Sequence, residues 1–240
     1  WLSCRQLSVN QQCLLPQTIA AWPARPRIVP VVLDPGNDPA AVRSTLDSLV
    51  GQLYAPSTVM VFSNAFDEES IRLELRPLSP HWPAQLNGLI EQVEGDWVYL
   101  LRAGDVLKES ALLVLAERVA VIPGLSCVYS DEGGLQDGRS FEPVFKPDFN
   151  LDLMRSYPYV GRSLAFSCKA IVGQGGFEPS FGELAPHDLL WRLTESQGLS
   201  AIEHIAEIQL ESTFSFAQWV SLPEVIEQSP RVLSAHLQRL

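Results

Sequence analysis

Polar side chains that could bind a ligand follow four predicted strands of this 240-residue sequence. They lie in the segments 34–38, 63–66, 102–105 and 130–132, which together contain carboxylates, amides and one arginine. Carboxylate oxygens are the ligands that Mg²⁺ and Mn²⁺ prefer, and a guanidinium binds phosphate through paired hydrogen bonds. These residue types therefore indicate a site for an anionic ligand, with or without a divalent cation.

The strands that position these segments are short runs of apolar and β-branched residues. We expect them at 28–33, 58–62, 97–101 and 127–129, with helices between them at 39–52, 67–75, 86–93 and 108–121. This alternation is typical of a doubly wound, mainly parallel α/β sheet flanked by helices, in which ligands bind beyond the carboxyl ends of the strands. Pro30 cannot donate to a neighbouring strand, so we expect it at a sheet edge or a strand start.

The rest of the chain is less regular. We expect a helix at 187–197, a strand at 201–210 and a terminal helix at 222–240, while the prolines of the first 27 residues favour an irregular lead-in or a short helix. This gives three parts: a lead-in (1–27), an α/β domain (28–220), and a C-terminal helix (221–240) that leads to a further domain.

Composition excludes several classes of protein. The formal net charge of -11 would repel nucleic acid, so we expect no nucleic-acid partner. No apolar run reaches the roughly 18 residues of a transmembrane segment. Cys4, Cys13, Cys127 and Cys168 form no C-x-x-C pair, which favours ordinary, mostly buried thiols. A chain that begins with Trp1 and lacks a signal sequence is expected to be a cytoplasmic fragment of a longer protein.

A set of short motifs occurs in a fixed order between about residues 27 and 210. They are LDSLVGQLY at 46–54, VYSDE at 128–132, PVFKPD at 143–148, YVG at 159–161, GGFEPSF at 175–181 and DLLWR at 188–192. This set resembles bacterial family 2 glycosyltransferases. The resemblance implies the GT-A fold, a nucleoside-diphosphate-sugar donor, a glycan or protein acceptor, and a Mg²⁺ or Mn²⁺ ion that bridges the donor's diphosphate.

The donor side departs from the family pattern. Asn37 remains from a P-x-Y-N motif, and Asn64 stands near the place of two aspartates, where it could contact a uracil or thymine edge. The metal motif D-x-D-D reads Arg102-Ala103-Gly104-Asp105, so the resemblance assigns a metal to Asp105 alone. Arg102 is interpreted either as a substitute for the cation on the diphosphate or as a solvent-facing loop residue.

The acceptor side also departs from the pattern. Pro186 stands where the family has its catalytic base, which leaves Asp188 and Glu183 as candidates, although Asp188 also suits a helix N-cap or first turn. His187 is interpreted as a substrate-binding group that titrates near neutrality or as a surface residue of that helix. Asp131 and Glu132 would lie on the acceptor side of the cleft or form a turn after a strand.

One further metal-binding motif of the family, H-W-R, is replaced by Leu210-Glu211-Ser212, and His204 nearby is interpreted as a structural histidine. Scaffold motifs therefore remain while four chemical motifs are lost. We predict a catalytically impaired, pseudoenzyme-like domain that acts as a structural or substrate-presenting module of a larger glycosyltransferase. Two alternatives stay open: an active transferase with an unusual metal or diphosphate site, and an unrelated doubly wound α/β binding domain, which strand order would distinguish.

Overall fold

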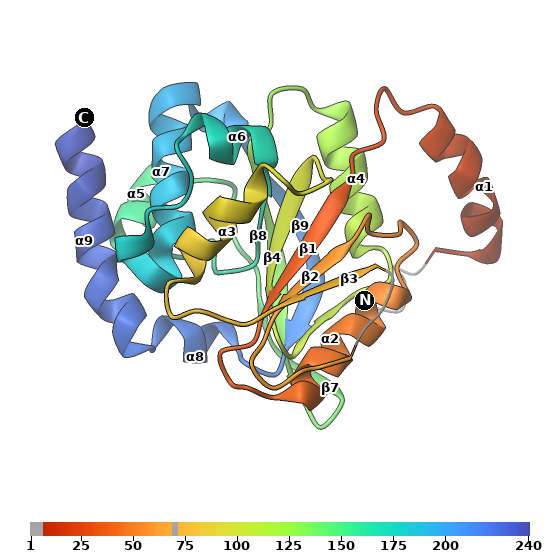
Figure 1. The fold of residues 1–240 in the computed structure, drawn as a ribbon. Coiled ribbons are helices and arrows are strands. Elements are labelled where there is room, and N and C mark those ends of the chain that lie inside the picture. The colour runs from red at the N-terminus through yellow and green to blue at the C-terminus, as the bar shows by residue number, and fades with distance from the viewer. Residues whose placement is uncertain (1–6, 69–71) are drawn as a thin grey trace.

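A computed structural model of the chain describes residues 7–68 and 72–240 (Figure 1). The strands are β1 (Ile28–Leu33), β2 (Val59–Phe62), β3 (Leu73–Arg76), β4 (Trp97–Arg102), β5 (Asp105–Leu107), β6 (Cys127–Gln136), β7 (Arg139–Val144), β8 (Leu164–Ser167) and β9 (Ile202–Ser212). The α-helices are α1 (Val9–Ala20), α2 (Pro39–Val50), α3 (Trp82–Ile90), α4 (Ala111–Val121), α5 (Leu151–Ser156), α6 (Cys168–Gly173), α7 (Ala185–Gln197), α8 (Phe216–Val220) and α9 (Pro223–Arg239). Two 3₁₀ helices, η2 (Pro179–Leu184) and η3 (Leu199–Ala201), flank α7.

The strands that the structure describes form one mixed sheet in the order β3-β2-β1-β4-β8-β6-β9-β5, and β7 pairs with β6 beside this path. The strands β3, β2, β1 and β4 are parallel to one another, and β6 is parallel to β9. Strand β8 is antiparallel to both β4 and β6. The predicted α/β class with a mainly parallel sheet flanked by helices is therefore confirmed.

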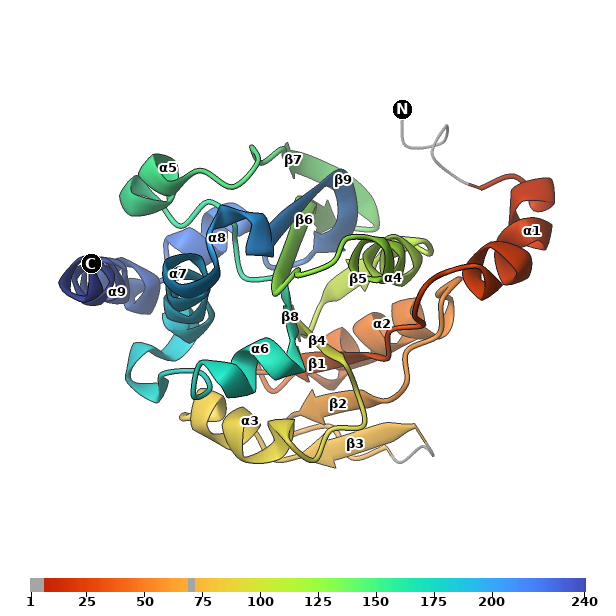
Figure 2. The same ribbon diagram turned by 90° about the horizontal axis from the view of Figure 1, so that it is seen from above.

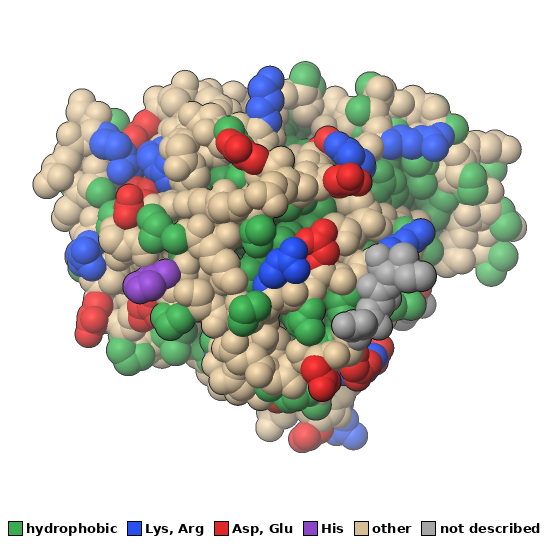
Figure 3. Space-filling view, in the orientation of Figure 1, with side chains coloured by type: hydrophobic (Ala, Val, Ile, Leu, Met, Phe, Trp, Pro, Cys, Tyr) green, Lys and Arg blue, Asp and Glu red, His purple; other side chains and the backbone are tan. Residues whose placement is uncertain are grey.

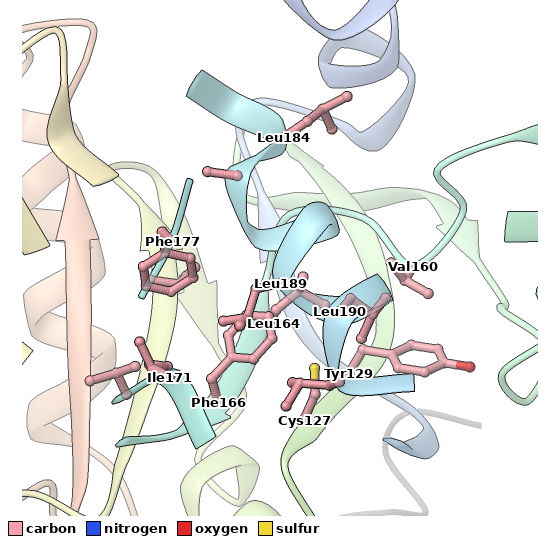
Figure 4. Close-up of a cluster of buried hydrophobic side chains, with 14 of the residues drawn as sticks. Cys127, Tyr129, Val160, Leu164, Phe166, Ile171, Phe177, Leu184, Leu189 and Leu190 are labelled. Atoms are coloured by element: carbon pink, nitrogen blue, oxygen red, sulfur yellow. The ribbon is translucent and has the colours of Figure 1, made fainter. Parts of the chain in front are cut away.

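Two hydrophobic clusters cover the two faces of the sheet. One lies under α2 and α4, and the other lies under α3, α6 and α7, as the view from above shows (Figure 2). In the second cluster, Phe166 of β8 and Phe177 pack edge to face at 5.8 Å between ring centroids, beside Leu189 and Leu190 of α7 (Figure 4). Burial of this cluster on a central strand fixes α7, and with it the residues at the amino end of that helix.

The prediction for Pro30 is wrong, because β1 is a central strand between β2 and β4. Pairing of β1 with β2 runs from Val31 to Leu33, whereas β4 is paired along the whole of β1. Pro30 therefore lies before the part of β1 that pairs with β2. At that position the missing N–H group of proline costs no hydrogen bond between strands.

The helix predicted at 67–75 is also wrong where it can be compared. Residues 69–71 lie outside the described residues, and Leu73–Arg76 is the edge strand β3. Its side chains alternate between half-buried leucines and the exposed Glu74 and Arg76, which is the period of a strand.

The strand predicted at 127–129 continues to Gln136, so Gly133 and Gly134 do not form the expected turn. A side chain at Gly134 would meet the Phe141 ring of β7, because a Cβ atom at this position would lie 2.5 Å from that ring. Glycine at this position lets β6 pair with β7 and β9 at the same time.

The remaining predicted elements are found with shifted ends, and α1 gives the lead-in a short helix that begins at a Ser8–Gln11 capping box. The terminal helix α9 packs against α7 and η2.

On the face shown in Figure 3, acidic and basic side chains are interspersed rather than separated by sign. No helix in the described part of the chain is long and apolar enough to cross a membrane.

The three cysteines that the structure describes have free thiols. Cys127 is buried, Cys168 is half-buried and Cys13 is exposed, while Cys4 lies outside the described residues. Burial raises the pKa of the Cys127 thiol, and it raises the pKa of Cys168 to about 11. These two thiols are therefore protonated and unreactive at neutral pH.

Candidate functional site

A small cleft of about 40 Å³ opens at the carboxyl ends of β1 and β4. Its wall is mostly apolar and includes Leu78 and Trp82. Three charged side chains complete the lining: Arg102 at the end of β4, Arg162 just before β8, and Glu183 of η2. The chemistry of this lining, an apolar wall with a few converging charges, matches that of small-molecule sites, whereas its volume is well below the roughly 300–1,000 Å³ of enclosed ligand pockets.

Arg102 lies in this cleft and is not a solvent-facing loop residue, because its side chain is only 20% exposed. Its guanidinium stacks 4.2 Å above the Phe214 ring and lies 4.0 Å from Oε1 of Glu183. Burial lowers the pKa of Arg102 from its ordinary value, against the opposite effect of Glu183. The cleft therefore holds a fixed cation that is partly open to solvent.

Asp105 is fully buried and is held by Arg162 on both oxygens. The Arg162 Nη1 and Nη2 atoms lie 2.6 and 2.7 Å from Oδ2 and Oδ1 of Asp105, and Oδ2 also accepts from the Arg102 backbone N–H at 2.8 Å. Arg162 donates further to Ser212 Oγ and the Phe214 carbonyl. Burial lowers the pKa of Arg162, but Asp105 outweighs that effect, and the net shift is upward.

The residues present do not fit a divalent cation at this place. Nowhere in the described ranges do three His, Cys, Asp or Glu side chains come together to hold a metal ion. Asp105 already has a guanidinium on both oxygens, and a second positive charge beside it would be repelled. Arg162 therefore occupies the carboxylate that the resemblance assigns to a metal.

Glu183 is the candidate base that lines the cleft. Its side chain is 20% exposed, and its backbone N–H donates to Oε1 of Glu224 in the first turn of α9 at 3.0 Å. Burial raises the pKa of the Glu183 carboxyl, although Arg102 and Arg162 act in the opposite direction. The carboxyl is thus positioned by its backbone and is not locked by a short side-chain contact to Arg102.

Asp188, the other candidate base, is buried within α7 and has no free oxygen. Its Oδ2 accepts from Nε of Arg192 at 2.8 Å, and its Oδ1 accepts from Nη1 of Arg239 at 3.0 Å. It lies in the first turn of the helix, as one interpretation expected, but the N-cap residue is Leu184. Arg192 links two turns of α7 to each other, and Arg239 links α7 to α9.

His187 is neither a surface residue nor a group that titrates near neutrality. It is 2% exposed, and its Nε2 donates to the Gly161 carbonyl at 2.8 Å. Burial lowers the pKa of His187 to about 4 against the effect of this hydrogen bond. It is therefore a neutral internal donor.

Asp131 and Glu132 are buried in strand β6, and they form no turn. Glu132 pairs with Lys146 at 2.8 Å. Oδ1 of Asp131 accepts from the Lys146 backbone N–H and from Nε2 of His204. His204 stacks on a tyrosine and also contacts Asp148, so it is structural as expected. Both acids hold the segment around Lys146 onto β6.

The two predicted asparagines lie apart from these charges. Asn37 is exposed with a φ of 51°, in the turn before α2. Asn64 is exposed and donates to the Leu78 carbonyl at 3.1 Å. The sequence interpretation did not select Asp34, which is buried and accepts a 2.6 Å hydrogen bond from Ser63. This pair joins the ends of β1 and β2.

Arg162 and Phe214 were also missed as components of the cleft. Each belongs to the irregular second half, and neither has a motif of its own. The one sequence signal for Arg162 is its place directly after the YVG motif. Its partner Asp105 is 57 residues away in the sequence, so only the sheet order brings them together.

No family model matches the chain. It is 30% identical over 93% of its length to the O-antigen biosynthesis protein RfbC of Myxococcus xanthus, and 25% identical over all of its length to the uncharacterized protein y4gI of Sinorhizobium fredii. The chain spans 19% and 28% of the lengths of these two relatives.

Solved structures with the same fold include two proteins with nucleotides bound. TarS of S. aureus, in complex with UDP, superimposes with a TM-score of 0.60 at 12% identity, covering 88% of this chain and 65% of that one. Glucosyl-3-phosphoglycerate synthase of Mycobacterium tuberculosis, in complex with Mn²⁺, UDP-glucose and phosphoglyceric acid, gives 0.58 at 17% identity, covering 98% and 84%. These superpositions show that the chain has the predicted GT-A-like α/β fold.

Proposed function

We propose that this chain is a family 2-like glycosyltransferase domain with little or no catalytic activity. It serves as a structural or substrate-presenting module of a larger glycosyltransferase. Its ancestry is that of enzymes that depend on a nucleotide sugar. One observation carries the proposal: Asp105 and Asp188, two acids retained from the family's motifs, each have both oxygens bound by arginines of this chain.

A transferase of this kind needs a base that can accept the proton of the acceptor hydroxyl. Asp188 lies under two guanidinium groups at 2% side-chain exposure, so it has neither a free oxygen nor access to an acceptor. Asp131 and Glu132 are equally enclosed. The arrangement supports a scaffold in which former site positions have become part of the fold.

The alternative is an active transferase that uses an unusual site, and Glu183 favours it. This carboxyl lines the cleft, is partly exposed and has a raised pKa, as a general base often has. It would accept the acceptor proton while the acceptor oxygen attacks the sugar carbon and the nucleoside diphosphate leaves. Arg102 would stabilise the charge on that leaving group.

Donor breakdown tests the proposal. The purified 240-residue chain is incubated with UDP-, dTDP- and GDP-sugars, with and without Mn²⁺, and released nucleoside diphosphate is measured. We expect no release above the rate without protein. Release that disappears in Glu183→Gln but persists in Glu178→Gln, an exposed glutamate of the same region, would establish the active alternative.

The second half of the proposal concerns the larger protein. Loss of the domain's folded state should reduce the activity of the full-length transferase, whereas loss of Glu183 should not. Equal effects of a core variant such as Leu164→Asp and of Glu183→Gln on product formation would contradict a purely structural or presenting role.

A further inference from the structure

We propose that Glu183 is a displaceable internal counter-ion of Arg102, and that the diphosphate of a nucleotide replaces it in the cleft without a divalent cation. This inference rests on the proposed function, in which the cleft takes a nucleotide donor. It adds how the charge of that ligand is neutralised and which side chain controls its affinity.

Arg102 is held in place but is not saturated. Phe214 supports one face of the guanidinium, and the Arg102 backbone N–H is fixed by Asp105. Within the described residues its side chain makes no hydrogen bond, and the nearest acid oxygen, of Glu183, is 4.0 Å away. A charge-assisted hydrogen bond spans about 2.7–2.9 Å, so the donors of Arg102 remain available to phosphate oxygens.

Arg162 shows the opposite arrangement, because its terminal nitrogens are already bound within the chain and are not available to a ligand. Its side chain is 8% exposed and its two terminal nitrogens bind Asp105, Ser212 and Phe214. Its Nε is buried and has no partner in the part of the chain that the structure describes. The Asp105–Arg162 pair is thus a built-in cation and carboxylate in the wall of the cleft, beside Arg102.

Glu183 is the group that must move. Its backbone is held by Glu224, but its carboxyl reaches Arg102 only at 4.0 Å. The charges around it are Arg102 and Arg162, which favour its ionised form, and Glu224, which opposes it. Because Glu183 cancels the charge of Arg102, an incoming diphosphate must compete with it, and removing that negative charge should strengthen binding.

The experiment is calorimetric titration of the chain with UDP, dTDP and GDP, in EDTA and in Mn²⁺. We expect the same Kd under both conditions for the nucleotide that binds. We expect Glu183→Gln to tighten binding by about 3- to 10-fold, which corresponds to roughly 1 kcal/mol. Glu178→Gln should leave Kd unchanged, because this carboxylate caps its own loop at Ser180.

Two variants test the cation. Arg102→Gln should weaken binding by at least about 10-fold, a loss typical of a charged hydrogen bond. Phe214→Leu removes the support under the guanidinium and should weaken binding by a smaller factor. Arg76→Gln, on the exposed edge strand, is the matched loss of positive charge and should have no effect.

Three results would overturn the inference: binding that requires Mn²⁺, binding that weakens or stays unchanged in Glu183→Gln, and no binding of any of the three nucleotides at millimolar concentration. These results can be distinguished from results that contradict the proposed function. Donor turnover with metal-free binding would refute impairment alone, whereas absence of both binding and turnover would refute this inference and leave a structural module standing.

Discussion

At Asp105 the contacts of a single carboxylate differ from those that the family resemblance implies. The family resemblance assigns it to a metal, but in this fold its carboxylate is enclosed at 0% side-chain exposure by Arg162, Ser212 and the end of β4. An ion pair that is buried this completely is sensitive to the loss of either partner, because the remaining charge cannot reach water.

The first prediction follows from this pair. Asp105→Asn should lower the free energy of unfolding by about 3–5 kcal/mol, since it leaves the Arg162 guanidinium buried without a counter-charge. Urea denaturation followed by circular dichroism measures the change. Asp152→Asn, which removes an exposed ion pair with Arg155, is the control and should have a much smaller effect. Similar losses in both variants would contradict a special role for the buried pair.

A second residue-scale prediction concerns His187. Its pKa is lowered to about 4 in the folded chain, against about 6.5 in the unfolded chain, so the unfolded state binds the extra proton. Its contribution to stability is complete above pH 6.5 and is lost as the pH falls toward 4, by about 3 kcal/mol. Denaturation at about pH 7.5, 5.5 and 4.5 should show a steeper loss for the wild type than for His187→Gln.

Glutamine keeps a donor for the Gly161 carbonyl but does not titrate. The difference between the two proteins therefore isolates His187 from His204, whose pKa is raised in spite of burial by its bonds to Asp131 and Asp148. Parallel pH profiles of the two proteins would show that His187 is already accessible to protons in the folded state.

At the scale of elements, α9 connects two segments that contain candidate site residues. Glu224 in its first turn accepts from the Glu183 backbone, and Arg239 at its end binds Asp188 and Glu195. His236, between them, stacks on Trp191 of α7 at 3.9 Å. The terminal helix is therefore packed onto the domain along its length.

The third prediction tests this contact. Arg239→Ala should lower the free energy of unfolding by about 1–3 kcal/mol, because Asp188 and Glu195 each lose a charged hydrogen-bond donor and Asp188 stays buried. Gln238→Ala, an exposed neighbour in the same turn, is the control for helix propensity. Equal stabilities of the two variants, measured by thermal unfolding, would mean that α9 is not held through this residue.

Elements with strong local patterns could be predicted from the sequence, and those defined by distant partners could not. The apolar runs of β1, β2 and β4 are buried on both faces, and α2 has the spacing of a one-sided helix. Strand β5 has three residues and exists only because β9 pairs with it. Strand β8 is likewise defined by β4 and β6, which leaves little signal in its own sequence.

The same distinction applies to the site. Arg102 and Glu183 were identified because each lies at or beside a motif, and the structure brings both into one cleft. Arg162 was missed since its importance comes from Asp105, with which it shares no local pattern. Asp131 and Glu132 were placed beside a predicted strand, and their burial was not foreseen because it depends on the unexpected strand β7.

At the scale of the whole molecule, the domain matches a small part of much longer relatives, 19% and 28% of their lengths. A module inside a long chain can keep its fold for the sake of its neighbours after its own chemistry is lost. The proposed function implies such a history, which would preserve buried packing and internal ion pairs such as Asp105–Arg162.

The fourth prediction follows from the Asp105–Arg162 pair and concerns the stability of the whole fold. A ligand that binds only the native state raises stability by RT ln(1 + [L]/Kd), about 4 kcal/mol at about 1,000 times Kd, which is roughly 8–16 °C for a domain of this size. We expect about 1 mM Mn²⁺ to shift Tm by no more than an equal ionic strength of NaCl, since Asp105 is already paired and the net charge of -11 is screened equally by both salts. Differential scanning calorimetry in EDTA, NaCl and Mn²⁺ measures this shift. A rise of several degrees that is specific to Mn²⁺ and absent in Asp105→Asn would show that a metal competes with Arg162 for the carboxylate, and the cation of this cleft would then be exchangeable.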